Sequence, residues 1–202
     1  MFTPRVRVEQ DRVGMGERYA KTYENRLRDP LDADARAFIE TRETFYMASV
    51  SETGWPYVQH RGGPLGFLKV LGPERIGFAD YVGNKQFISK GNIAGDARVS
   101  LILMDYPRRA RLKLIGHATV EEAADNPALT DMLQTEGAAP AERLITIDLT
   151  AIDWNCPKYI TPRLTEPEIN AALAPKLKPL TDHIAALEAR LDAVDPGWRS
   201  PE

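Results

Sequence analysis

Short runs of alternating apolar and polar residues fill the middle of the chain, and a period of two is typical of β-strands with one buried face. Turns rich in glycine or proline separate these runs at the spacing of hairpins. The pattern predicts some six strands, one of them interrupted by Gly62-Gly63-Pro64, over residues 45–51, 56–62 resuming at 67–71, 75–81, 97–105, 111–121 and 143–153.

Two of these runs predict strands that differ in how many of their faces are buried. Residues 97–105 read ARVSLILMD, a continuous apolar run that predicts a strand buried on both faces. The strand at 111–121 alternates instead, so that Leu112 and Leu114 share one face and the cations Arg111 and Lys113 share the other.

Helical patterns precede the strands. Residues 32–42 predict a helix that is capped by Asp32 or Asp34, because a carboxylate at this position accepts hydrogen bonds from the first free N–H groups. A thinner apolar stripe predicts a short helix over residues 17–27.

One further helix is predicted between strands, over residues 127–136, with Pro127 at its first position and Asp125 or Asn126 as its cap. Many strands at hairpin spacing with few helices indicate an antiparallel barrel, not a doubly wound sheet. We therefore expect a mainly β protein with flanking helices in three parts: an arm and helix at 1–40, a barrel at 41–163 and a helical tail at 164–202.

The tail turns helical from Thr165, and Pro175 and Pro179 are expected to divide it. Beyond them, residues 181–194 predict an amphipathic helix with apolar residues spaced three, four and three apart. Two interpretations are open. The helix lies on the barrel, which we favour, or it pairs with the same helix of a second subunit.

Residues 78–92 carry the candidate chemistry. The strand 75–81 ends in a glycine-containing turn, and a short helix is expected from Asn84 onwards. The free N–H groups at such a helix start bind anions, typically phosphates, and Lys85 and Lys90 would add positive charge. The alternative is an ordinary turn with solvated lysines, which we favour for this turn taken alone.

Composition narrows the classes of function. The chain has 202 residues, 43% hydrophobic and 27% charged, which is ordinary for a globular protein. A formal net charge of −3 gives no reason to expect a nucleic acid or membrane partner. The single cysteine, Cys156, excludes an internal disulfide, and the three histidines lack metal-ligand spacing. With no signal segment and no apolar span, a cytoplasmic location is expected.

Several motifs in this order resemble the pyridoxamine 5′-phosphate oxidase-like family of flavin proteins. They are WPYVQHRGGP at 55–64, GFADYVGNKQFISKGN at 77–92, RVSLILMDY at 98–106, RLKLIGHA at 111–118 and WNCPKYITPR at 154–163. The resemblance implies an antiparallel, Greek-key, FMN-binding split β-barrel. It also implies a homodimer in which FMN lies in two clefts between the subunits.

The resemblance further implies a set of cofactor contacts. The flavin ring and ribityl chain would lie along one strand, the end of a second strand would flank the cofactor, and the following turn would bind the phosphate. A cationic strand face and a late segment from the other subunit would complete the site. The first strand would contribute Gln59, His60, Arg61 and Gly62, and the end of the second strand would contribute Ala79 and Asp80. The turn would contribute Asn84 and Lys85. The cationic strand face would contribute Arg111 and Lys113, and the late segment would contribute Asn155 and Lys158.

Each contact also has a simpler interpretation. Gly62 and Gly63 are equally well explained by a bulge or a barrel corner. His60 is better explained as a hydrogen-bonding strand residue than as a base. Arg111 and Lys113 would otherwise be an exposed strand face. No catalytic acid or base and no metal ligand is assigned.

The function implied is that of an FMN-dependent oxidoreductase acting on a small molecule. The vitamin-B6 enzyme has an Arg-x-His type pattern near its C-terminus that this sequence lacks, so we expect FMN with a different substrate, which the sequence does not identify. The alternatives are a non-catalytic flavin-binding or sensor protein, or a related protein that holds deazaflavin or haem. Haem would need an axial ligand, for which His60 and His117 are weak candidates.

Overall fold

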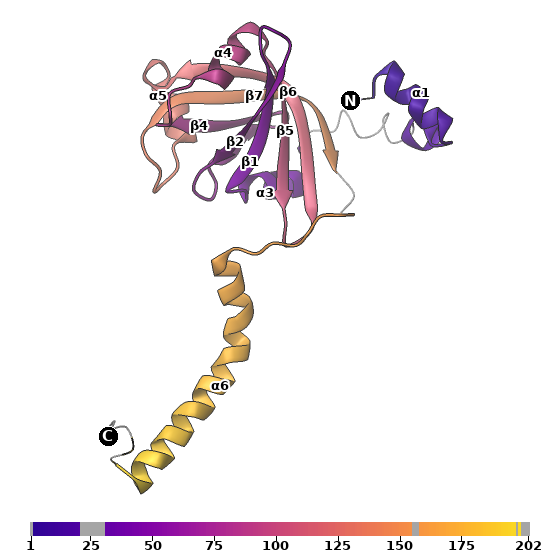
Figure 1. Cartoon of the computed structure of the whole chain (residues 1–202). Coiled ribbons are helices and arrows are strands. Elements are labelled where there is room, and N and C mark those ends of the chain that lie inside the picture. The colour runs from indigo at the N-terminus through magenta and orange to yellow at the C-terminus, as the bar shows by residue number, and fades with distance from the viewer. Residues whose placement is uncertain (1, 21–30, 155–157, 197, 199–202) are drawn as a thin grey trace. The chain divides into compact units, whose positions relative to one another are not determined.

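The computed structural model describes residues 2–20, 31–154, 158–196 and 198, and the chain divides into two compact units, residues 1–160 and 161–202. The first unit holds one seven-stranded sheet in which every pairing is antiparallel (Figure 1). Its strands are β1 (Thr44–Val50), β2 (Pro56–Gly62), β3 (Leu68–Gly72), β4 (Arg75–Tyr81), β5 (Arg98–Asp105), β6 (Ala110–Glu122) and β7 (Ala141–Trp154). The first unit also contains α1 (Pro4–Arg12).

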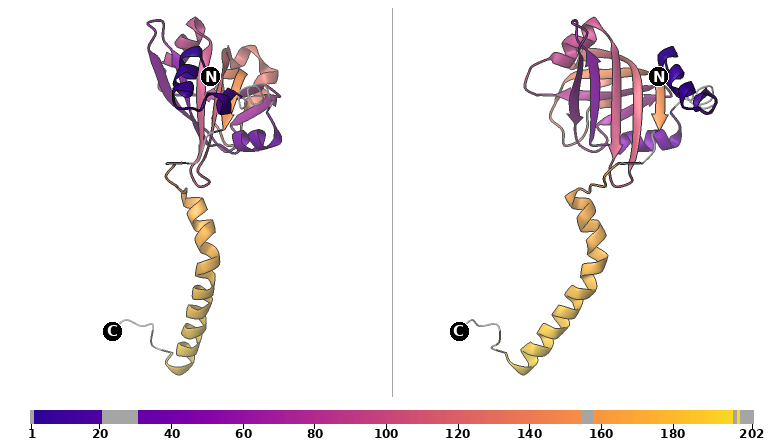
Figure 2. Two further views of the ribbon diagram at one scale, coloured as in Figure 1. Left: turned by 90° about the vertical axis from the view of Figure 1, so that its right-hand side faces the viewer. Right: turned by 45° about the vertical axis from the view of Figure 1, so that its right-hand side comes forward.

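The strand order, β2-β1-β5-β6-β7-β4-β3, forces the sheet to curl. Its two edge strands, β2 and β3, are consecutive in sequence and joined only by residues 63–67. A flat sheet would hold these edges about 29 Å apart, whereas the link spans at most about 21 Å. The sheet therefore curves into an antiparallel barrel that stays open between β2 and β3, which confirms the expected split β-barrel (Figure 2).

Aromatic rings fill the interior of the barrel near its opening. Phe45 and Phe67 stack with their ring centroids 5.7 Å apart, and Phe78 packs edge-on against Phe45 at 5.2 Å. A Cβ on Gly63 would lie 2.6 Å from the Phe67 ring, which is closer than real side chains approach. Close packing at the barrel corner thus accounts for Gly63 without any ligand.

The expectation that residues 97–105 are buried on both faces is wrong. In β5 the buried side chains alternate, with Val99, Leu101 and Leu103 inside and Arg98 and Ser100 exposed. The cause is tertiary, since the inner face meets the barrel core while the chain leaves the outer face of this strand only partly covered.

In each of two helices, one of the two predicted cap residues is confirmed. In α3 (Ala33–Glu40), Asp32 Oδ1 accepts a hydrogen bond from Ala35 N at 2.7 Å. In α5 (Pro127–Leu133), which follows a short 3-10 turn, Asn126 Oδ1 accepts from Leu129 N at 3.1 Å. This helix ends three residues earlier than predicted. Most of the helix expected at 17–27 lies outside the described residues.

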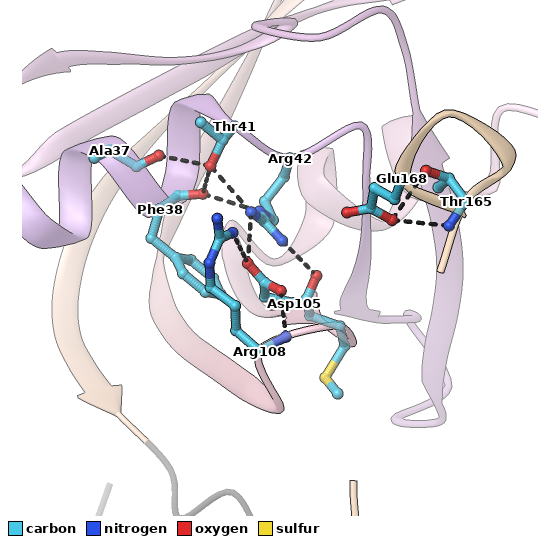
Figure 3. Close-up of polar contacts among 9 residues, drawn as sticks. Ala37, Phe38, Thr41, Arg42, Asp105, Arg108, Thr165 and Glu168 are labelled. Carbon is cyan, nitrogen blue, oxygen red and sulfur yellow. Dashed lines mark hydrogen bonds and ion pairs between the residues drawn. The ribbon is translucent and has the colours of Figure 1, made fainter. Parts of the chain in front are cut away.

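A buried carboxylate ties α3 to the turn between β5 and β6. Asp105, whose side chain is 3% exposed, pairs with Arg42 and with Arg108 at 3.0 Å each, and it also accepts from the Arg108 backbone N–H (Figure 3). Burial would raise the pKa of Asp105, but the hydrogen bonds from Arg108 and the charge of Arg42 outweigh it and lower that pKa.

The second unit contains one long helix, α6 (Glu166–Val194), which begins where Glu168 accepts a hydrogen bond from Thr165 N at 2.8 Å. The expectation that Pro175 and Pro179 divide this segment is wrong, because α6 continues through both (Figure 1). Each proline removes one backbone hydrogen bond, and a spacing of four places both losses on one side of the helix. No helix among the described residues is long and apolar enough to cross a membrane.

Candidate functional site

One carboxylate at the end of β4 holds two arginines. Asp80 Oδ1 lies 2.6 Å from Arg61 Nη1 of β2, and its Oδ2 lies 2.9 Å from Arg143 Nε of β7. All three side chains are less than one fifth exposed. Since β2 and β4 are not neighbours in the sheet, the Arg61–Asp80 pair crosses the open side of the barrel.

The two arginines differ in how fully their donors are paired. Burial would lower the pKa of Arg143, but the hydrogen bond to Asp80 and the nearby Glu142 carboxylate raise it overall. One buried donor at this end of the barrel, Arg61 Nε, has no hydrogen-bond partner within the described parts of the chain. Because a buried donor normally finds an acceptor, it indicates room for an oxygen atom of a ligand. Tyr81 Oη also lacks a partner there, but Tyr81 packs with Ala79 on the other face of β4.

The turn after β4 differs from the prediction. The helix α4 spans Ile88–Gly95, so it begins four residues later than expected. Asn84 Oδ1 accepts from Gln86 N at 3.2 Å, and Lys85 and Phe87 adopt left-handed φ angles of 58° and 55°. Left-handed residues cannot continue a right-handed helix, so residues 82–87 form a separate loop in front of α4.

Cations surround this loop. Lys85 is exposed and forms no ion pair with any residue that the structure describes. Lys90 of α4 pairs with Glu122, and this bond lowers the pKa of that carboxyl. The Phe87 ring lies 5.8 Å from Lys90 Nζ and 5.0 Å from Arg143 Cζ. The loop is therefore cationic as well as exposed.

Two hydrogen bonds fasten α4 over this end of the barrel. Ser89 Oγ donates to Gln59 Oε1 of β2 at 2.6 Å, and the buried Asn92 Nδ2 donates to Ser49 Oγ of β1 at 3.0 Å. Of the predicted site residues, the structure thus pairs Arg61 with Asp80 and places Gln59 two residues from Arg61 on the same face of β2. We call Gln59, Arg61, Asp80, Ser89 and Arg143 the barrel-end cluster.

Sequence reasoning missed Ser89 and Arg143. The only signal for Arg143 would have been its pairing directly opposite Asp80, which depends on the register between β4 and β7. That register links residues 63 positions apart and has no local sequence signature.

His60 and Lys113 lie on the opposite, outer face of the sheet. They end a cross-strand row that runs from His60 through Tyr46 and Ile102 to Lys113. The His60 and Tyr46 rings pack edge to face at 5.6 Å. Three strand spacings, about 14 Å, separate β2 from β6, so these two residues do not meet within one chain.

An open apolar groove of 410 Å³ borders this row. Its lining includes Ala48, Ser100 and Ile115, which lie two residues further along the same strand faces than Tyr46, Ile102 and Lys113. The groove is distinct from the barrel-end cluster, and it is lined mainly by nonpolar atoms. It suits a flat apolar group or a second protein surface.

The remaining predicted residues are dispersed. Ala79 is buried against Leu144 beneath α5, away from the barrel-end cluster. A Cβ on Gly62 would meet the His60 ring at 3.1 Å. Arg111 has a buried Nε without a partner among the described residues.

In the late segment, Lys158 is exposed with its Nζ 5.2 Å from the Tyr159 ring centroid. Asn155 lies outside the described residues. No three His, Cys, Asp or Glu side chains among the described residues could hold a metal ion.

Known structures share this fold. Two crystal structures of HupZ from Group A Streptococcus, a single-residue variant and the tagged protein, are each 13% identical, with TM-scores of 0.51 and 0.50. The matches cover 62% and 66% of this chain and 99% and 98% of HupZ. An FMN-binding protein from Syntrophomonas wolfei subsp. wolfei is 13% identical over 74% of this chain and 97% of its own, with a TM-score of 0.43.

At these identities the structural likeness shows the fold alone, and no curated protein matches the chain. The family comparison goes further. The family model described as pyridoxamine 5′-phosphate oxidase matches residues 31–156, well over half of the chain and all seven strands. The chain therefore belongs to the pyridoxamine 5′-phosphate oxidase family.

Proposed function

We propose that this protein binds FMN beside the barrel-end cluster and acts as an FMN-dependent oxidoreductase. The observation that carries the proposal is the concentration of positive charge at the end of β4. Arg61, Arg143, Lys85 and Lys90 gather there against three carboxylates, in a chain whose overall charge is −3. Family membership supports a flavin as the anionic ligand.

The loop at residues 82–87 is the proposed phosphate contact. Lys85 supplies an exposed ammonium group, and no carboxylate of the described chain competes for it. Asn84 stands beside it, with its side chain turned back to the Gln86 N–H. A phosphate here would gain a charge-assisted hydrogen bond from Lys85 and attraction from the neighbouring cations.

The free edge of β2 is the proposed contact for the rest of the cofactor. The sheet order ends at β2, so one edge of this strand has no neighbouring strand among the described residues. A ligand along that edge reaches both strand faces, with Gln59 and Arg61 on one and His60 on the other. The unpaired Arg61 Nε fits an oxygen acceptor of such a ligand.

A second subunit is part of the proposal. Arg111 and Lys113 lie three strands from β2, and Lys158 lies beyond β7, so one chain cannot bring them to the same cofactor. They would contact FMN from the partner of a homodimer. The apolar groove beside Lys113 would then face the partner or the ring.

When bound, FMN would supply hydride transfer at its N5. The chain's own residues would bind and orient it, and the barrel end would restrict water. Asp80 is already engaged by two arginines, and we assign no catalytic acid or base. The same observation favours a second candidate, a flavin-binding protein without turnover.

Titration of the full chain with FMN, followed by flavin fluorescence, tests the cofactor. We expect Lys85→Ala to weaken binding about thirtyfold, which corresponds to about 2 kcal/mol for one charge-assisted hydrogen bond. Lys178→Ala is the matched control, because this exposed lysine of α6 pairs only locally with Asp182. Equal affinities for the two variants would place the phosphate elsewhere.

A second measurement separates the two candidate functions. Consumption of a reduced nicotinamide cofactor with a panel of electron acceptors should proceed if the protein is an oxidoreductase. FMN binding without any consumption would support the non-catalytic alternative. Competition with deazaflavin and haem on the same protein tests whether the site prefers FMN, and a protein that takes up no FMN refutes both candidates.

A further inference from the structure

The helix α6 carries a continuous apolar stripe that no described residue of its own unit covers. The stripe residues are all 41% to 83% exposed, and α6 has no buried residue. Their spacing alternates between four and three from the first to the last, over Leu173, Leu177, Leu180, Ile184, Leu187, Leu191 and Val194. This is a heptad repeat with apolar residues at both a and d positions.

Because α6 continues through both prolines, the heptad repeat is long enough for two such helices to pair. The sequence alone predicts an apolar stripe of under two heptads, because Pro175 and Pro179 are expected to divide the helix. In the structure the stripe runs unbroken from Leu173 to Val194, about 33 Å of helix. Both prolines fall at f and c positions, so their missing N–H groups lie on the side away from the stripe.

We propose that α6 pairs in parallel and in register with α6 of a second copy of this chain. Charges beside the stripe favour the parallel orientation. The g positions carry the basic residues Lys176, His183 and Arg190, whereas the e position 188 carries Glu188, and Asp195, the C-cap residue directly after α6, follows at the next e position. A parallel pair sets each g residue against an e residue of the partner's next heptad, so His183 faces Glu188 and Arg190 faces Asp195.

The antiparallel alternative is disfavoured by the same charges. It would set g against g and e against e, which brings base to base and acid to acid. One further a position, Asn170, is polar. A single buried asparagine at an a position favours two strands in one register, because each side chain then finds its counterpart. The remaining charges, such as the Lys178–Asp182 pair, lie on the outer side.

This pairing is independent of flavin binding. It joins the C-terminal units and does not depend on how the barrels associate. It is tested by oxidative cross-linking of the full chain after Cys156→Ser removes the single native cysteine. Val194→Cys lies at a d position near the end of the helix, and Ala193→Cys is its matched control at the adjacent c position. We expect Val194→Cys to form a covalent dimer at least tenfold faster than Ala193→Cys.

A second substitution connects the cross-link to the stripe. Adding Leu187→Glu to Val194→Cys should reduce the rate at least tenfold, whereas Ala186→Glu, which adds the same charge at a c position, should leave it unchanged. Circular dichroism of each variant verifies that the barrel remains folded. Equal rates for Val194→Cys and Ala193→Cys would overturn the proposal. So would a mixture that links Leu173→Cys only to Leu191→Cys, the product of antiparallel pairing, in which d positions meet a positions.

Discussion

Neutralising Asp80 is the most direct perturbation of the barrel-end cluster. Asp80→Asn keeps the shape of the side chain but removes the charge that balances two arginines, which are 12% and 10% exposed. Removing one partner of a buried ion pair costs about 3 to 5 kcal/mol, because the other charge stays buried and unbalanced. Arg143 retains Glu142 at 3.0 Å, so we expect the lower end, about 3 kcal/mol.

Urea unfolding of the full chain, followed by circular dichroism and tryptophan fluorescence, measures this loss as a lower midpoint with an unchanged slope. Asp182→Asn is the control, since its pair with Lys178 is 65% to 77% exposed and should contribute less than about 1 kcal/mol. FMN should stabilise the Asp80→Asn variant more than the natural protein, because a bound phosphate replaces part of the lost negative charge. If both variants unfold at the same urea concentration, the cluster is not the buried ion network described above.

Two further predictions concern the barrel itself. Asp105→Asn should destabilise the protein at neutral pH. The pKa of Asp105 is lower in the folded protein than in the unfolded chain, so the ionised carboxylate contributes fully to stability above about pH 4. This contribution disappears as the pH falls through the lowered pKa of the folded state. Urea midpoints of both proteins across pH should therefore converge in acid, and a constant difference would exclude this carboxylate as the cause. Gly63→Ala should lower the unfolding free energy by about 1 to 3 kcal/mol, because its Cβ would lie 2.6 Å from the Phe67 ring. Gly72→Ala, with open space around it, serves as the control in thermal unfolding. Gly54 also has open space, but its φ of 82° would add backbone strain to an alanine there.

The sequence was sufficient for features that depend on neighbouring residues. Alternation placed the strands within a few residues, as in β4 at Arg75–Tyr81 and β2 at Pro56–Gly62. Cap chemistry narrowed each cap to two candidates that include the observed Asp32 and Asn126, because a cap needs only the next three residues. The order of motifs also led to the family, since it reflects the whole chain and not one site.

Local reasoning failed where a residue's conformation depends on distant partners or on backbone angles. Two left-handed residues, Lys85 and Phe87, delayed the start of α4, although neither is a glycine. The apolar run of β5 is buried on one face only, because the curled sheet covers just its inner side. Pro175 and Pro179 predict a division of the C-terminal helix, but α6 continues through both. Its heptad stripe is therefore longer than the one predicted for residues 181–194.

The sequence by itself determined the strands, the caps and the cationic turn after β4. Only the tertiary structure decided that Arg61 and Arg143, from strands far apart in sequence, share the carboxylate of Asp80, and that His60 and Lys113 end the same cross-strand row. The physical reason is that strand periodicity and capping act over a few residues, whereas strand register and the closure of a curled sheet bring together residues separated by 19 to 63 positions.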